Sequence, residues 1–153
     1  GLPDFLRRIK ALGYAVKLDT NGGNPAMVGS LVDQQLLDYI ALDVKASEEA
    51  YPVVCGANAR WEAVEETLSL LKASPHPLEV RTTVYPTMES ADLLRVSTMI
   101  GTVPLWRLNT YRIPDLYKET DTDRIHAPVM EKETIKGWIE ENRERIEALH
   151  LTT

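Results

Sequence analysis

The hydrophobic positions of this chain follow two alternating spacings. Stretches with an apolar residue every three or four positions predict helices, and the short apolar or β-branched runs between them predict strands. The expected strands are residues 14–19, 38–44, 78–85 and 105–111, and the expected helices are residues 2–12, 24–36, 59–73, 89–100 and 131–148. Strand–helix alternation is typical of βαβ units. We therefore predict an α/β fold, a partial (β/α) barrel of about four parallel strands with flanking helices and a C-terminal helix, since four strands are too few to close a barrel.

Each expected helix carries an apolar face that we predict to be buried. In the first helix this face comprises Leu2, Phe5, Leu6, Ile9 and Leu12, and in the last helix it comprises Ile135, Trp138, Ile139 and Ile146. After the second strand, Ser47 is expected to cap a short helical turn, and the chain around Pro52 and Gly56 is expected to be irregular. The polar segment 112–130 contains two prolines and is expected to be a long loop.

Size and composition narrow the class of protein. A chain of 153 residues is long enough for one domain, 1–153, and too short for two comfortable ones. The net charge of −6 argues against nucleic-acid binding, which needs clustered Lys and Arg. The single cysteine, Cys55, allows no internal disulfide, and no apolar run approaches the roughly 18 residues of a membrane span. We expect a cytoplasmic protein with neither nucleic-acid nor membrane partners.

Polar residues follow two of the expected strands where each one ends. Asp19, Thr20 and Asn21 end the first strand, and Asp43 and Lys45 end the second. The carboxyl ends of parallel strands meet at one edge of the sheet, where ligands bind in α/β folds. We therefore expect two carboxylates and an ammonium close together, able to hold an amino acid head group, a cation or both. The alternatives are a turn that satisfies its own backbone after the first strand, and a solvated lysine at the end of the second.

The third and fourth strands add further candidates. Arg81 lies inside an otherwise apolar strand, where it could reach a ligand carboxylate or form a structural pair with Glu79 on the same face. Asn109, Tyr111 and Arg112 end the fourth strand, where an aromatic ring and an amide could receive a planar base.

The remaining reactive side chains suggest no site of their own. His76, His126 and His150 are expected in two loops and a tail, without the spacing of a metal triad. Cys55 is expected to be a small buried residue rather than a nucleophile, and the acidic segment 115–123 a solvated surface.

Four segments, in chain order, carry a family resemblance. They are Leu2-Pro3-Asp4-Phe5-Leu6, Lys17-Leu18-Asp19-Thr20-Asn21-Gly22, Asp38-Tyr39-Ile40-Ala41-Leu42-Asp43-Val44-Lys45 and Val80-Arg81-Thr82-Thr83-Val84-Tyr85-Pro86. They resemble consecutive segments of the radical S-adenosylmethionine (SAM) activating enzymes. The anaerobic ribonucleoside-triphosphate reductase activating proteins are most similar, and the pyruvate formate-lyase activating enzymes are near relatives. The Asp-Thr-Asn-Gly and Asp-Val-Lys motifs are the specific parts, and relatives often have Val-Pro-Gly where this chain has Tyr85-Pro86-Thr87.

The resemblance implies a partial (β/α)6 barrel, an incomplete TIM barrel, in which SAM lies across the C-terminal ends of the strands. Asp19, Thr20 and Asp43 match positions at the methionine end of SAM and at a monovalent-cation site, to which the Ala41 carbonyl would also contribute. Lys45 matches a lysine of that pocket. Arg81 would approach the methionine carboxylate, and the 109–112 strand end the adenosine. The implied cofactor-binding set is Asp19, Thr20, Asn21, Asp43, Lys45, Arg81, Asn109 and Tyr111.

One departure from the family bears on activity. The family binds a 4Fe-4S cluster through a Cys-x3-Cys-x2-Cys loop after its first strand and has Gly-Gly-Glu after its second, and this chain contains neither. The chain also opens Gly1-Leu2-Pro3 without an initiator methionine, so we expect a piece of a longer enzyme, the parent. The parent would be an oxidoreductase that cleaves SAM reductively and takes a hydrogen from a glycine of a glycyl-radical enzyme, anaerobic ribonucleotide reductase. With one cysteine where three thiolates are needed, this chain alone is expected to be inactive, with no catalytic residue and no iron–sulfur ligand.

Two other classes of function stay open on the sequence. One is a non-catalytic α/β module that binds a small ligand or a partner, and the other is a Schiff-base lyase that uses Lys45 beside Asp43. Because an open sheet has two unpaired edges, we also expect this chain to self-associate.

Overall fold

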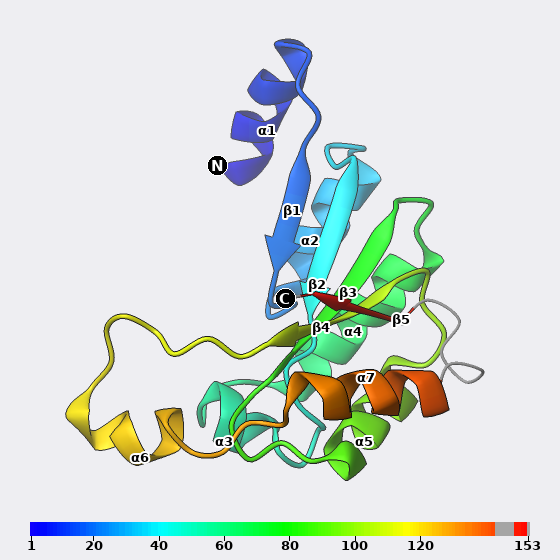
Figure 1. The fold of residues 1–153 in the computed structure, drawn as a ribbon. Helices are drawn as coiled ribbons and strands as arrows, with labels where there is room; N and C mark the ends of the chain where they lie inside the picture. The colour runs from blue at the N-terminus through cyan, green and yellow to red at the C-terminus, as the bar shows by residue number, and fades with distance from the viewer. Residues whose placement is uncertain (143–148, 153) are drawn as a thin grey trace.

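The computed structural model describes residues 1–142 and 149–152, which form a five-stranded parallel sheet with helices packed against it (Figure 1). The strands are β1 (Lys17–Thr20), β2 (Tyr39–Asp43), β3 (Leu78–Val84), β4 (Trp106–Thr110) and β5 (Leu149–Thr152). The helices are α1 (Leu2–Ala11), α2 (Pro25–Asp33), α3 (Tyr51–Cys55), α4 (Trp61–Ala73), α5 (Ser90–Ile100), α6 (Thr122–Ile125) and α7 (Lys132–Glu141), with a 3-10 turn η1 (Glu119–Asp121). Within the described ranges, no helix is long and apolar enough to cross a membrane.

The sheet confirms the predicted α/β class. Its spatial order β1-β2-β3-β4-β5 equals the order along the chain, and all neighbouring pairs are parallel. Asp19 stands in register with Ala41, and Asp43 stands in register with Arg81. Successive strands that each return through a helix keep their carboxyl ends on one side of the sheet. That side is called the rim below.

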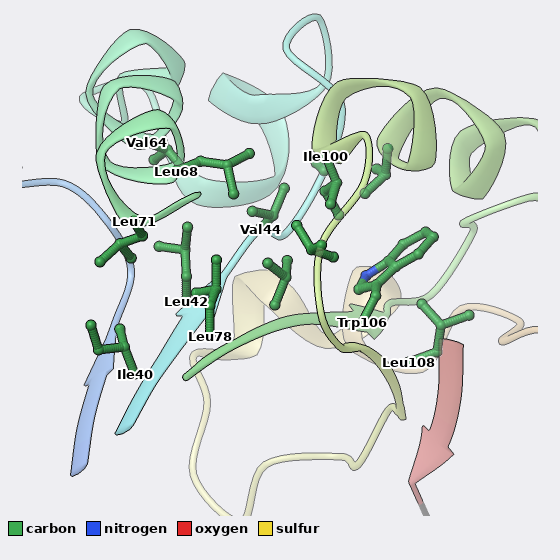
Figure 2. Close-up of a cluster of buried hydrophobic side chains, with 14 of the residues drawn as sticks. Ile40, Leu42, Val44, Val64, Leu68, Leu71, Leu78, Ile100, Trp106 and Leu108 are labelled. Carbon is green, nitrogen blue, oxygen red and sulfur yellow. The ribbon is translucent and has the colours of Figure 1, made fainter. Parts of the chain in front are cut away.

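Alternate residues of the central strands point toward the helices and form the core (Figure 2). In Figure 1, α2 and α4 lie behind β2 and β3. The sheet contributes fully buried Ile40, Leu42, Val80 and Leu108, and α4 meets them with Val64, Leu68 and Leu71, as its apolar spacing predicted. Burial of one such leucine or isoleucine is worth about 1.5–3 kcal/mol, so this layer positions the strands and hence the rim.

Buried hydrogen bonds link β3 and β4 to the residue that follows β2, and a ring contact connects β4 to α7. The hydroxyl of Thr82 donates to the carbonyl of Val44 at 2.6 Å and accepts from the indole N–H of Trp106 at 3.0 Å. The ring of Trp138, on α7, packs edge-on to Trp106 with centroids 6.1 Å apart. Because these buried polar groups are satisfied, they hold the strands together without an uncompensated desolvation cost. Trp138, Ile135 and Ile139 are buried as predicted.

The prediction for the first helix is wrong for most of its apolar face. Leu6 is buried, whereas Leu2, Phe5 and Leu12 are 41%, 57% and 72% exposed. The physical reason is position, since α1 lies beside β1, the edge strand, and not over the middle of the sheet (Figure 1). The amphipathic pattern therefore predicted the helix correctly. It did not predict that most of the apolar side of this helix would be left uncovered.

The start of the first strand and the segment after the second strand also differ from the sequence prediction. β1 begins at Lys17, and Tyr14, expected in the strand, is 65% exposed. Ser47 is buried and caps no helix, while the stretch expected to be irregular forms α3 with Pro52 in its first turn. Proline has no N–H to lose in a first helical turn, which is why it fits there.

The C-terminal third holds more regular structure than its polar sequence suggested. The segment 112–130, expected to be a loop, contains η1 and α6. Helix α7 ends at Glu141, and Ile146, expected on its buried face, lies outside the described residues. His150, expected in a tail, lies in β5, which pairs in parallel with β4 and makes a fifth strand.

Candidate functional site

The sheet has an apolar side and a polar side because side chains alternate along each strand. The side opposite to the helix-covered core carries Lys17 and Asp19 from β1, Tyr39 and Asp43 from β2, Glu79 and Arg81 from β3, and Arg107 and Asn109 from β4. We call this the polar face. The polar face meets the rim at the carboxyl ends of the strands, where the predicted site residues lie.

Arg81 joins the two predicted carboxylates. Its Nε and Nη2 atoms each lie 2.9 Å from Oδ1 of Asp43, and its Nη1 lies 3.2 Å from Oδ1 of Asp19. The in-register pairing of Asp43 with Arg81 on neighbouring strands places the first contact, and β1 brings the second carboxylate from beyond β2. Because the Arg81 side chain is only 22% exposed, these are partly desolvated, charge-assisted contacts.

The alternative pairing of Arg81 with Glu79 does not occur. Glu79, with an 8% exposed side chain, instead accepts a hydrogen bond from the Tyr39 hydroxyl at 2.8 Å and lies 3.2 Å from Nε of Arg107. Burial and the neighbouring Glu79 carboxylate raise the pKa of Tyr39, so this hydroxyl stays a donor at neutral pH. Glu79 therefore pairs with Arg107 and not with Arg81, which contacts both rim carboxylates.

Tyr39, Glu79 and Arg107 are polar-face residues that the sequence analysis did not assign to the site. A signal for them existed in the strand alternation. Tyr39 lies four residues before Asp43 and Glu79 lies two residues before Arg81, so each shares a strand face with a predicted residue. Arg107 stands in register with Arg81 on the next strand. Lys17 completes this row, 3.4 Å from the carboxylate of Asp19 and 5.5 Å from the ring centroid of Tyr39.

The turn after β1 is self-satisfied, as one alternative predicted. The hydroxyl of Thr20 accepts from the N–H of Gly22 at 3.1 Å, and the side-chain oxygen of Asn21 accepts from the N–H of Gly23 at 3.0 Å. Gly22 has a φ of +73°, and the hydroxyl of Thr67, on α4, donates to its carbonyl at 2.7 Å. These contacts direct the turn toward α4 and leave Asp19 as the residue of this segment that points into the polar cluster.

Lys45 lies at the border between the rim and a cavity. Its Nζ is 3.8 Å from Oδ2 of Asp43, too long for a direct hydrogen bond, and its side chain is 48% exposed. It also lines a cavity of about 460 Å³ together with Tyr51 and Cys55. Burial raises the pKa of the Cys55 thiol, although Tyr51 and Lys45 oppose that rise. Cys55, expected to be buried, is only partly buried.

The end of β4 contributes to a different cavity. Tyr111 lines a hollow of about 330 Å³ together with Tyr85, Pro86, Val54 and Ile125. Asn109 stands in register with Thr83 at the same end of the sheet. Arg112 is exposed and does not line this hollow. Tyr85 is a second aromatic ring that the sequence analysis did not assign here.

The loop after β3 contains a strained residue. Thr87 has a φ of +69°, a conformation that β-branched residues rarely adopt, and its N–H donates to the carbonyl of Pro128 at 2.8 Å. The family resemblance described above implies Val-Pro-Gly for Tyr85-Pro86-Thr87, and the φ of Thr87 is one that suits glycine.

Within residues 1–142 and 149–152, no group of three or more His, Cys, Asp and Glu side chains could hold a metal ion. Asp19 and Asp43 share a guanidinium and form a two-carboxylate site with a cation already between them.

The fold is similar to that of a domain of pyruvate-formate lyase-activating enzyme from Bacteroides vulgatus, known from its crystal structure. The two agree with a TM-score of 0.72 over 99% of this chain and 89% of that chain, at 12% sequence identity. The similarity concerns the fold, and it matches the parallel sheet with flanking helices described above.

The sequence is similar to that of a Methanocaldococcus jannaschii protein provisionally named a glycyl-radical enzyme activating enzyme. The two are 27% identical over 121 residues, which cover 76% of this chain and 50% of the relative. The chain thus spans about half the length of the curated relative it matches. No family model matches the sequence. The similarity supports the family resemblance at the level of glycyl-radical enzyme activating enzymes.

Proposed function

We propose that this chain is part of a radical SAM activating enzyme for a glycyl-radical enzyme, and that its rim forms one wall of the SAM site. The observation that carries the proposal is the meeting of Asp19, Asp43 and Arg81 at the carboxyl ends of three adjacent parallel strands. These residues lie in the segments that carry the family resemblance, and the sequence relative and the fold relative both support it.

The chemistry of the rim fits the amino acid end of SAM. That end carries an ammonium and a carboxylate, and the rim offers carboxylates at Asp19 and Asp43 and cations at Arg81 and Lys45. Arg81 already bridges both carboxylates, so a bound carboxylate would share its guanidinium, which has five N–H donors. Thr20 and Asn21 would act through their turn, and Asn109 with Tyr111 would face the adenosine.

The residues of this chain do not fit a 4Fe-4S cluster. Such a cluster needs several cysteine thiolates, and the sequence has one cysteine, Cys55, whose thiol is half-buried beside Tyr51. We therefore propose that the cluster and the reductive cleavage of SAM belong to the parent enzyme, and that this chain alone orients SAM without reacting with it.

A monovalent cation at Asp19, Thr20 and Asp43 is a finer part of the proposal. Arg81 now neutralises both carboxylates, so an added cation would require the guanidinium to move toward the ligand carboxylate. The partner proposed for the parent is a glycyl-radical enzyme, specifically anaerobic ribonucleotide reductase, and the proposed compartment is the cytoplasm. The Schiff-base alternative gains no support, since a side chain as exposed as Lys45 is not the desolvated amine that it needs.

Calorimetric titration of the chain with SAM tests the proposal. We expect saturable one-to-one binding, weakened about tenfold in Asp43→Asn because a charge-assisted contact to the ligand ammonium is lost. Asp33→Asn removes an exposed carboxylate on α2 and is the matched control, expected to bind as the unsubstituted chain does. Repeating the titration with tetramethylammonium in place of potassium tests whether SAM binding depends on the proposed monovalent cation.

Circular dichroism would establish that both variants keep the fold. Absence of saturable binding, or equal affinities for Asp43→Asn and Asp33→Asn, would contradict a SAM site at this rim.

A further inference from the structure

A cavity on the helix side of the rim has a size typical of ligand sites. Its volume is about 460 Å³, inside the usual range of roughly 300–1,000 Å³ for small-molecule sites. Its wall comes from the turn after β1, the segment after β2, α3 and the start of α4, and comprises Asn21, Gly23, Lys45, Tyr51, Val54, Cys55, Asn58, Ala59, Arg60, Ala63 and Val64. We call it the α3–α4 cavity.

The charge of this wall is opposite to that of the chain. The wall includes Lys45 and Arg60 and contains neither aspartate nor glutamate, although the chain has a net charge of −6. The nearest acidic partners do not hold these cations tightly. Lys45 is 3.8 Å from Asp43, and Arg60 is 3.8 Å from Glu62, both beyond direct hydrogen-bond distance. Both cations therefore keep N–H donors for a further oxyanion.

Two asparagine amides also line the wall. The side-chain oxygen of Asn21 accepts from Gly23, which leaves its NH2 group as the donor, and Asn58 adds a second amide. Tyr51 packs against Trp61 with ring centroids 5.7 Å apart and gives the cavity one aromatic side. A wall with two cations, two amides and one aromatic ring suits an anionic group attached to a small organic body.

We propose that the α3–α4 cavity binds the oxyanion of a small organic molecule, a phosphate or a carboxylate, with Arg60 and Lys45 as its cationic contacts. This site is separate from the SAM wall proposed above, which lies on the polar face, and the two meet only at Lys45 and the turn at Asn21. Occupation of the cavity draws Lys45 away from Asp43, so the anion also changes the charge at the rim.

Titration of the isotope-labelled chain with inorganic phosphate, and separately with acetate, tests the proposal by NMR. Ionic strength is held constant with chloride. We expect saturable shifts in the amides of residues 58–64 and in Gly23. Tighter binding of phosphate indicates a phosphorylated ligand, and tighter binding of acetate indicates a carboxylate.

Variants at exposed positions of the wall keep the test independent of folding. Because Arg60 is exposed and exposed ion pairs are weak, Arg60→Gln is expected to lower the affinity about three- to fivefold, while Arg60→Lys stays within about twofold. Asn58→Asp places a like charge in the cavity without changing its shape and is expected to weaken binding by roughly fivefold or more. Arg8→Gln, an exposed arginine on α1, is the matched control.

Three results would overturn the proposal. They are shifts that also appear with chloride alone, shifts unaffected by Arg60→Gln and Asn58→Asp, and one-for-one displacement of phosphate by SAM, which would make the two sites one. Because the probes are simple anions, the first two results do not depend on whether the rim binds SAM.

Discussion

Gly22 shows how one residue connects the local turn to the core. Its φ of +73° suits glycine, and a Cβ atom built there would lie 2.9 Å from Cδ1 of Leu42 and 3.3 Å from Cα of Val64. The second atom belongs to the backbone of α4 and has little freedom to move. The turn that ends β1 and presents Asp19 therefore requires glycine for two independent reasons, conformation and space.

Gly22→Ala is expected to lower the free energy of unfolding by about 2–3 kcal/mol, the sum of the positive-φ cost and the overpacking against α4. Urea unfolding measures this. Gly137→Ala is the control, since Gly137 lies inside α7 with open space around it, and is expected to raise stability by about 0.5–1 kcal/mol. Equal stability of Gly22→Ala and the unsubstituted chain would show that the turn can move away from α4.

Thr87 is the opposite case, a residue whose conformation suits glycine better. Thr87→Gly is expected to raise the free energy of unfolding by about 0.5–1 kcal/mol, because it relieves a left-handed β-branched residue and keeps the N–H bond to Pro128. Thr102→Gly is the control, because Thr102 is exposed and has no positive φ. Thermal denaturation of both variants separates the relief of the positive φ from the effect of introducing a glycine. Only the first variant should be stabilised.

At the scale of elements, Asp38 fastens α1 to the sheet. Its carboxylate accepts from Nζ of Lys10 at 2.8 Å and from the N–H of Val16 at 2.7 Å. The hydrogen bond from Lys10, followed by that from Val16, lowers the pKa of Asp38 below its usual value. A helix whose apolar side is mostly exposed thus depends on a polar attachment.

The lowered pKa makes this attachment pH-dependent. The contribution of Asp38 is present above its unfolded pKa of about 4 and is lost as the pH falls through its lower folded pKa. Asp38→Asn should therefore be less stable than the unsubstituted chain at pH 7, with a difference that shrinks as the solution is acidified. Hydrogen exchange of the α1 amides should report the same loosening, and a pH-independent difference would contradict this assignment.

At the scale of the whole molecule, the sheet is open at β1 and the apolar side of α1 is exposed next to that edge. Exposed apolar side chains beside an edge strand favour association with another surface. In the isolated chain that surface is expected to be a second copy.

Sedimentation equilibrium should therefore show a concentration-dependent dimer. Phe5→Glu, at a 57% exposed position of α1, should weaken the dimer, and Leu116→Glu, at a 92% exposed position far along the chain, should leave it unchanged. A monomer at all concentrations would contradict the expectation.

Much of the fold could be predicted because its signals are local. The apolar run Ile40, Ala41 and Leu42 predicted the second strand, and all three residues are fully buried. The spacing of Val64, Leu68 and Leu71 predicted the buried face of α4. β5 could not be predicted in this way, because it is four residues long and becomes a strand only by pairing with β4.

The site was predictable in its members but not in its pairings. Two carboxylates and the ammonium of Lys45 were expected close together at the rim. The structure instead joins the two carboxylates through Arg81, and Lys45 stays 3.8 Å from Asp43. The expected partner of Arg81 was Glu79, on the same face of its strand, or a ligand carboxylate; Asp43, on the neighbouring strand, was not an expected partner. Parallel register decided the pairing, because it places Asp43 beside Arg81 and leaves Glu79 to Tyr39 and Arg107.

The sequence by itself determined the α/β class, the parallel alternation and the polar strand ends, because period and residue chemistry are properties of neighbouring positions. The tertiary structure decided which apolar faces are covered, which carboxylate holds Arg81, and that Lys45 borders a cation-lined cavity beyond the rim. These depend on residues tens of positions apart. Sheet register and helix placement, rather than local pattern, bring such residues together.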